Sequence, residues 1–214
     1  MDHRVVSLAD QVFEKLEKDI LTEVYAPGEI LSESRLSEDM KVSRTPIRDA
    51  LVRLEEEHLL DVTSKGARVV GMNMQDIDDI YDIRMHIEGL AARKAAELAT
   101  EEGLQAMRKC LDEQEFHISR QDHEGVQAMD SRFHSILYEI CGSPILRYTL
   151  EPLHRKLIKY RQVSITVPNR AERSLKEHRG VYEAIARRNP DESEKRMVEH
   201  IRSAWDNIRQ STRK

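Results

Sequence analysis

The stretch Val42-Ser43-Arg44-Thr45-Pro46-Ile47-Arg48-Asp49-Ala50-Leu51 decides the fold of the first part of this 214-residue chain. Ser43 is a favourable N-cap and Pro46 is tolerated in the first turn that follows, so we expect a helix from Arg44 to about Glu57. One face of that helix is apolar and is expected to pack against neighbouring helices; it carries Ile47, Leu51 and Leu54.

The sequence around this stretch has an informative order of elements. Apolar spacing predicts a helix from Leu8 to about Val24, which Ala26-Pro27-Gly28-Glu29 ends. A short helix over 34–40 and a tight turn lead into the 44–57 helix. Two valine-rich segments, 60–63 and 67–70, flank Ser64-Lys65-Gly66 and indicate a hairpin. Helix, helix, turn, helix, hairpin is the order of a winged helix-turn-helix, which we place at residues 1–72.

Three polar residues occupy the exposed N-terminal end of the predicted third helix, namely Arg44, Thr45 and Arg48. A recognition helix presents this end to base edges in the major groove, and an arginine can hold guanine O6 and N7 with two hydrogen bonds. The alternative is that these side chains only solvate a helix face. The agreement of turn, cap, preceding helices and following hairpin favours DNA binding.

The charge of the chain limits how DNA can be bound. The formal net charge is −5, and residues 1–70 contain ten Lys or Arg against fifteen Asp or Glu. DNA binding must therefore come from a small basic surface, and it should depend strongly on salt.

The remaining residues, 73–214, form a second domain in this interpretation. Short connections between successive helices favour an antiparallel six-helix bundle. The predicted fold class is therefore mainly α, with a winged helix-turn-helix followed by this bundle. Apolar spacing and breaks at glycine, proline and asparagine predict helices over 75–100, 101–120, 123–141, 144–165, 170–188 and 190–212.

Composition bears on the cellular location. No segment approaches the roughly 20 apolar residues that cross a bilayer, and the N-terminus lacks the apolar core of a signal peptide. The two cysteines, Cys110 and Cys141, match no metal or redox spacing. We therefore expect a cytoplasmic protein with no membrane partner.

Four residues of the second region have the chemistry of metal ligands. Asp130 and His134 are four residues apart and share a helix face. His178 and His200 each lie in an apolar stripe of a later helix, where an unpaired polar side chain is costly. If the four converge, one carboxylate and three imidazoles would bind a divalent transition metal. The spacing alone leaves open that each histidine is an ordinary hydrogen-bonded core residue.

The first region resembles the GntR family of bacterial regulators. The resemblance implies base or phosphate contacts for Arg44, Thr45 and Arg48, and a minor-groove contact for the wing tip at Lys65 and Gly66. The segments that carry the likeness are Ser32-Glu33, Leu36-Ser37, VSRTPIRDAL from Val42, Arg53-Leu54-Glu55 and Lys65-Gly66.

Two positions depart from the family pattern. Many relatives have arginine where this chain has Ser34, so that DNA contact is lost or is taken over by Arg35. Relatives usually have glycine where this chain has His58. The histidine must therefore adopt the left-handed conformation at some cost, or the helix ends in a different way.

The second region resembles the FCD ligand-binding domain of FadR-type members of that family, in its shorter six-helix form. Residues 79–88 match the family's first-helix pattern. The four metal positions of the family are matched in type and order by Asp130, His134, His178 and His200. The resemblance implies a bound zinc ion, with nickel, manganese or iron as alternatives.

The same resemblance implies a small organic acid as effector, which meets the metal and a nearby arginine. Arg84 is our candidate for that arginine, and its alternative role is a salt bridge to Glu88. Tyr160 and Arg161 are weaker candidates for the effector pocket.

Together these features predict a ligand-responsive, sequence-specific transcription regulator, expected to be a repressor and not an enzyme. We expect a homodimer, because a two-fold protein reads a near-palindromic operator in double-stranded DNA. The alternatives are a regulator that senses the metal itself, a purely structural metal, and a metal-dependent hydrolase. The hydrolase would need a general base for metal-bound water, and the sequence shows no dedicated motif for one.

Overall fold

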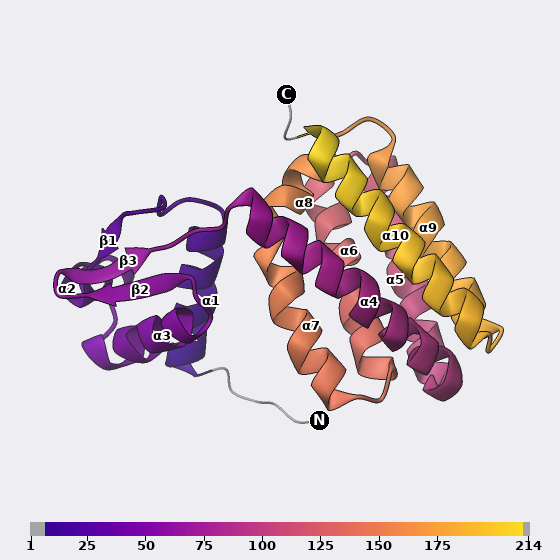
Figure 1. The fold of residues 1–214 in the computed structure, drawn as a ribbon, viewed down its shortest axis with the longest axis horizontal. Helices are drawn as coiled ribbons and strands as arrows, with labels where there is room; N and C mark the ends of the chain where they lie inside the picture. The colour runs from indigo at the N-terminus through magenta and orange to yellow at the C-terminus, as the bar shows by residue number, and fades with distance from the viewer. Residues whose placement is uncertain (1–6, 212–214) are drawn as a thin grey trace. The chain divides into compact units, whose positions relative to one another are not determined.

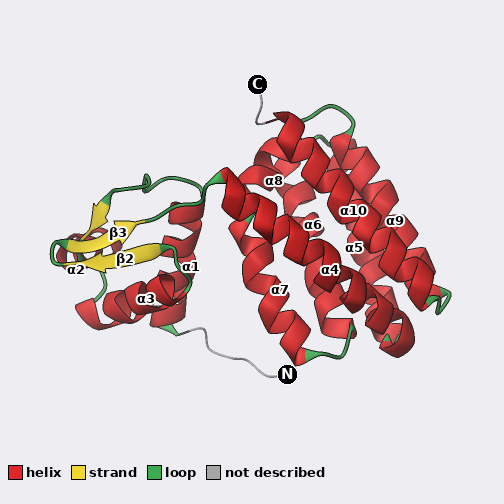
Figure 2. Ribbon diagram, in the orientation of Figure 1, coloured by secondary structure: helices red, strands yellow, loops and turns green. Residues whose placement is uncertain are grey.

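The computed structural model describes residues 7–211 and has a mainly helical fold, which confirms the predicted fold class. The chain divides into two compact units, Met1–Met74 and Gln75–Lys214, and each is described on its own. The described strands all belong to the first unit, whereas the second consists of helices and their connections (Figure 2). None of the described helices is long and apolar enough to span a membrane.

The first unit packs three helices against a small antiparallel sheet (Figure 1). The sheet has the order β1-β3-β2, and β2 and β3 form the hairpin that we call the wing. Helix α1 packs against α3, and the fully buried Leu16 and Leu54 lie in this core; burying a leucine contributes roughly 1.5–3 kcal/mol. The elements are α1 (Leu8–Leu21), β1 (Ile30–Leu31), α2 (Glu33–Met40), α3 (Arg44–Glu56), β2 (Leu60–Thr63) and β3 (Gly66–Val69).

Strand β1 is an element that the sequence does not predict, because two residues are too few to show an alternating pattern. It pairs with β3 through Ile30↔Arg68 and Leu31↔Ala67. The close approach explains the glycine at the start of β3. A Cβ on Gly66 would lie 2.7 Å from the Leu31 carbonyl oxygen, so a larger residue would displace β1.

The start of α3 lies where the sequence predicts it, but Ser43 caps it without a side-chain hydrogen bond. The helix begins at Arg44, and Ser43 has the extended backbone of an N-cap, but its side chain makes no capping hydrogen bond. By contrast, the Ser32 side chain caps α2 by accepting from the Arg35 N–H. The first helix ends at Leu21 rather than near Val24, whose N–H turns back to the Asp19 carbonyl.

The end of α3 shows that His58 adopts the left-handed backbone conformation that relatives usually give to a glycine. His58 has φ of 58°, in the left-handed region. Its N–H donates to the Glu55 carbonyl at 2.8 Å, and the Leu59 N–H donates to the Leu54 carbonyl at 2.9 Å. These are the two hydrogen bonds of a Schellman cap. His58 therefore ends the helix as a glycine would, at a conformational cost of roughly 1–2 kcal/mol.

The described part of the second unit has seven helices, one more than predicted, because 144–165 is two helices. The break lies at Leu157, which is fully buried and whose N–H donates to the His154 carbonyl three residues earlier. No glycine or proline marks this junction, so periodicity could not reveal it. The helices are α4 (Met74–Leu98), α5 (Glu101–Ser119), α6 (His123–Ile140), α7 (Pro144–Lys156), α8 (Ile158–Ile165), α9 (Arg170–Ala186) and α10 (Pro190–Ser211).

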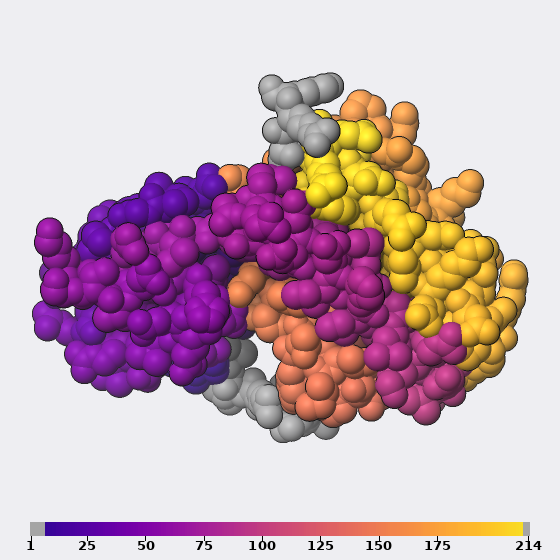
Figure 3. Space-filling view, in the orientation of Figure 1, coloured from indigo at the N-terminus to yellow at the C-terminus, as the bar shows by residue number. Residues whose placement is uncertain are grey.

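The packing of these helices places three of them around one interior. Helix α5 packs on both α6 and α9, and α9 packs on α10. Helix α4 runs beside α10 (Figure 1), where Tyr81 stacks on Trp205 with ring centroids 4.8 Å apart. Seen from the side of α4 and α10, the second unit presents a largely closed surface (Figure 3). The side chains of His134 on α6, His178 on α9 and His200 on α10 are buried in this interior.

Candidate metal centre and DNA-binding surface

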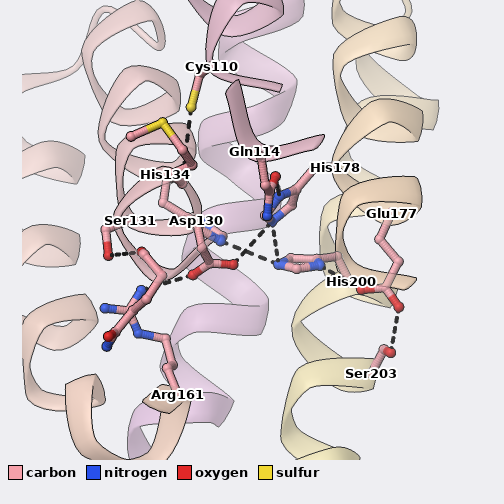
Figure 4. A network of polar contacts seen from close by, with 12 residues as sticks. Cys110, Gln114, Asp130, Ser131, His134, Arg161, Glu177, His178, His200 and Ser203 are labelled. Carbon is pink, nitrogen blue, oxygen red and sulfur yellow. Dashed lines mark hydrogen bonds and ion pairs between the residues drawn. The ribbon is translucent and has the colours of Figure 1, made fainter. Parts of the chain in front are cut away.

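Three histidines from three helices meet in this interior (Figure 4). His134 comes from α6, His178 from α9 and His200 from α10, and each is at most 3% exposed. The Nε2 atoms of His178 and His200 are 3.2 Å apart, and those of His200 and His134 are 3.3 Å apart. The structure thus brings the three predicted imidazole ligands together with their Nε2 atoms toward one another.

The other ring nitrogen of each histidine is occupied by an oxygen. A ring whose Nδ1–H donates to that oxygen presents a lone pair on Nε2 when Nε2 carries no proton, which is the form that binds a metal. Two lone pairs facing each other at 3.2 Å repel unless a cation lies between them. The acceptors are Glu88 Oε2 at 2.7 Å from His134, Gln114 Oε1 at 3.1 Å from His178, and Glu177 Oε2 at 2.8 Å from His200.

Asp130 completes the set that the sequence predicts. It lies one turn before His134 on α6, and its Oδ1 is 3.7 Å from His178 Nε2. Its Oδ2 accepts a hydrogen bond from Arg161 Nη1 at 3.0 Å. The carboxylate therefore faces the histidines on one side and a guanidinium on the other.

The protonation states suit a cation. Burial lowers the pKa of His178 well below its usual value, and the neighbouring His200 adds to this effect. Burial also lowers the pKa of His200, although the hydrogen bond to Glu177 opposes it. Burial would raise the pKa of Asp130, but Arg161 and the histidines outweigh it and hold the pKa well below the ordinary value. Neutral imidazoles and an ionised carboxylate are the forms that bind metal ions.

The residues present fit a divalent transition metal. Metal–nitrogen distances of about 2.0–2.1 Å place two nitrogen ligands roughly 2.9–3.4 Å apart for angles between octahedral and tetrahedral values. The two Nε2 separations, 3.2 and 3.3 Å, fall inside that range. Imidazole and carboxylate donors suit zinc, nickel, manganese and iron.

A small cavity of about 30 Å³ lies against this cluster, and three arginines line it. Each is paired with a carboxylate: Arg84 with Glu88, Arg161 with Asp130, and Arg170 with Glu177. Arg84 forms the salt bridge to Glu88 that was one of its two expected roles, and it also lines the cavity. Its contact with an effector stays a prediction. The lining includes Arg161 but not Tyr160, which is half-buried one residue earlier on α8.

Sequence reasoning names the ligands but not the residues that support them. Glu177 adjoins His178 in the sequence, yet its partner is His200 across the α9–α10 pair. Burial raises the pKa of Glu88, but Arg84 and His134 bring it down to about 2. Gln114 carries no local signal, because its contact with His178 depends on how α5 and α9 pack. Arg170 and His154 are also missed for that reason; His154 is buried and contacts Arg161.

The predicted DNA-contact residues of the first unit lie on its surface. Arg44, Thr45 and Arg48 are exposed on the N-terminal half of α3, and Lys65 is exposed at the tip of the wing. Arg35 on α2 is engaged by two acidic side chains, with its guanidinium 3.5 Å from Glu29 and 3.6 Å from Asp39. Arg48 is held by two hydrogen bonds to Glu33.

Each of the two units matches the model of a known protein family. Residues 8–70 match the model of the gntR family of bacterial regulatory proteins, and residues 79–203 match the FCD domain. The HTH-type transcriptional repressor RspR of Escherichia coli strain K12 is 29% identical over 94% of this chain and 88% of its own. The Nta operon transcriptional regulator of Aminobacter aminovorans is 30% identical over 86% of each chain.

Solved structures show the same fold. The E. coli McbR/YncC structure superposes with a TM-score of 0.82 and 23% identity, covering 97% of this chain and 100% of that one. The FCD match alone spans more than half of the sequence. The chain therefore belongs to the GntR family of bacterial transcription regulators, in the group whose DNA-binding domain is followed by an FCD domain.

Proposed function

We propose that this GntR-family regulator holds a divalent transition metal ion, preferably zinc, and that a small carboxylate bound beside the metal controls its binding to DNA. The metal ligands in this proposal are Asp130, His134, His178 and His200. The observation that carries it is the approach of three Nε2 atoms whose rings each donate from Nδ1 to a glutamate or glutamine oxygen. A metal ion held there supplies a Lewis-acid position for an oxygen of the effector.

The charges around the cavity support an organic anion as the effector. The guanidiniums of Arg84, Arg161 and Arg170 are each balanced by one carboxylate. Burial lowers the pKa values of His178 and His200, which disfavours further positive charge on these rings. A divalent ion adds positive charge that these buried groups do not compensate. A small carboxylate restores the balance and can accept hydrogen bonds from an arginine.

The DNA-binding end of the proposal rests on the first unit. Arg44, Thr45 and Arg48 are proposed to contact bases or phosphates, and the wing tip at Lys65 to contact the minor groove. A homodimer would present two such surfaces to a near-palindromic operator.

Helix α4 is the proposed connection between effector and DNA. It starts directly after the first unit along the chain, and it carries both Arg84 and Glu88. An effector that binds both Arg84 and the metal ion would link α4 to the helices that hold the metal ligands, and so shift α4 against them. Couplings of this kind change affinity by about 1–3 kcal/mol, or roughly 5- to 150-fold.

Operator binding tests this proposal. Metal-loaded and chelator-treated protein are compared, each with and without members of a panel of small organic acids. We expect one class of acid to release the operator from metal-loaded protein only. If chelation alone toggles DNA binding and no acid does, the metal itself is the signal. If neither acid nor chelation changes operator binding, the proposed regulation is wrong.

A further inference from the structure

We propose that Glu33 is a specificity-determining residue of the DNA-binding surface. It fixes the guanidinium of Arg48 in one orientation, and it weakens binding to DNA of the wrong sequence. The inference rests on the proposed role of Arg48 as a base-contacting residue, and the experiment below separates the two.

The contact between the two side chains is bidentate. Glu33 is the first residue of α2, and Arg48 lies in the second turn of α3. Arg48 Nε donates to Glu33 Oε1 at 3.0 Å, and Arg48 Nη2 donates to Oε2 at 2.9 Å. Because two parallel hydrogen bonds join two planar groups, both the plane and the direction of the guanidinium are set. The bond from Arg48 lowers the pKa of Glu33, so the carboxylate stays charged at neutral pH.

The ion pair with Glu33 leaves the tip of the Arg48 guanidinium free to contact a base. The bonds to Glu33 use Nε and one hydrogen of Nη2, so the donors at the tip of the guanidinium remain. Those donors can form the two hydrogen bonds to guanine O6 and N7. The Arg48 side chain is 67% exposed and that of Glu33 is 32% exposed, so the carboxylate supports the arginine from the protein side. A long side chain that is already oriented loses less freedom on binding.

The charge of Glu33 has a second effect. A carboxylate beside DNA is repelled by phosphates, so it lowers affinity for every sequence. This loss is offset only where Arg48, in its fixed orientation, meets a matching base pair. Specificity is a difference between affinities, and it increases both when the right site is favoured and when wrong sites are disfavoured.

Asp49 offers a matched control. It is exposed and directly follows Arg48, and it raises the pKa of Arg48 less than Glu33 does. Among the described residues it makes neither a hydrogen bond nor an ion pair with Arg48. Asp49→Asn therefore removes the same charge from the same surface and leaves the Glu33–Arg48 pair intact.

The experiment uses the full chain. An operator is selected from random-sequence duplexes with the wild type, and Kd is measured for it and for a scrambled duplex at two salt concentrations. We expect Glu33→Gln to bind the scrambled duplex more tightly and the operator more weakly. The ratio of the two affinities should fall about tenfold, within the roughly 5- to 150-fold discrimination of a well-placed arginine. Asp49→Asn should strengthen both and keep the ratio.

Glu33→Asp separates charge from geometry. It keeps the negative charge but shortens the side chain, so operator binding should weaken without a gain for the scrambled duplex. The melting temperature of each variant is compared with that of the wild type, because Glu33 also lies in the first turn of α2.

The inference is overturned if Glu33→Gln does not weaken operator binding, and two forms of that result are informative. One is a Glu33→Gln variant that behaves like Asp49→Asn, since Glu33 would then act through charge alone. The other is a Glu33→Gln variant that binds the operator more tightly, since Glu33 would then withhold Arg48 from DNA. If Arg48→Ala leaves operator binding unchanged, the recognition-helix assignment itself is wrong. If Arg48→Ala weakens it and Glu33→Gln does not, only the role of Glu33 is wrong.

Discussion

Single ring nitrogens decide what the centre of the second unit can bind. His134, His178 and His200 would be ordinary buried residues if each donated from Nε2 to a neighbouring oxygen. Instead, Glu88, Gln114 and Glu177 take the Nδ1–H groups, and the Nε2 atoms are turned inward. Partners of this kind fix the tautomer and the ring orientation and raise the basicity of the ligand. The three oxygen partners therefore matter to the site nearly as much as the histidines.

Replacing one of these partners tests their role. Glu88→Gln keeps the size of the side chain but removes the charge that holds His134 Nδ1–H. Metal affinity should fall about 10- to 100-fold, as for other outer partners of metal-bound histidines. The measurement is a titration of metal against a competing chelator. Glu199→Gln is the control, because Glu199 adjoins His200 but is exposed. Equal loss in both variants, or in neither, would count against the role of Glu88.

His58 gives a prediction that is independent of the metal. Because its φ is 58°, a glycine should relieve the left-handed strain at the end of α3. We expect His58→Gly to raise the free energy of unfolding of the first unit by roughly 1 kcal/mol, measured by urea denaturation. Glu56→Gly, inside the last turn, should lower it by about as much. An unchanged midpoint for His58→Gly would mean that the cap is not strained.

The helices and strands show which structural features local sequence signals can predict and which they cannot. Local signals are enough for α3 and the wing, where the cap, the apolar face and the turn residues agree. They fail for β1, which exists only because β3 offers it a partner, and for the junction at Leu157, which is set by packing rather than by glycine or proline. They also place Asp130 and His134 on one face of α6. They cannot show Gln114 against His178, because that contact joins helices 64 residues apart in the chain.

Neutral histidines buried between helices make stability depend on pH. Burial lowers the pKa values of His154, His178 and His200 below the ordinary value of about 6.5. Below that pH the unfolded chain binds protons that the folded chain does not, so the free energy of unfolding must fall as pH falls. Each histidine contributes up to about 1.4 kcal/mol per pH unit. The pKa of Glu88 is about 2 and that of Glu177 is about 2, so these carboxylates stay charged in this window.

Urea denaturation of chelator-treated protein at pH 7.5, 6.5 and 5.5 measures this effect. We expect little change between the two higher values and a clear loss of stability at pH 5.5. His178→Gln should reduce the slope, because it removes one of the groups. A stability that stays constant down to pH 5.5 would show that the histidines are not held neutral.

In the whole molecule, the surface proposed to contact DNA and the histidine cluster proposed to bind metal lie in two different units. The first has a basic surface of few residues on an acidic domain, and the second has a buried cluster of histidines beside a small cavity. A regulator needs the state of the second to change the affinity of the first, and α4 is the element that follows the first unit directly in the chain. The family assignment is secure without the metal, whereas the proposed control of DNA binding depends on it.

The metal content of the purified protein is therefore the most direct test. Elemental analysis is made on untagged wild type, His178→Ala and His123→Ala, the last replacing an exposed histidine at the start of α6. We predict close to one divalent transition metal ion per chain in the wild type and in His123→Ala, and a large loss in His178→Ala. Equal metal content in all three, or no metal taken up by the wild type, would contradict this prediction.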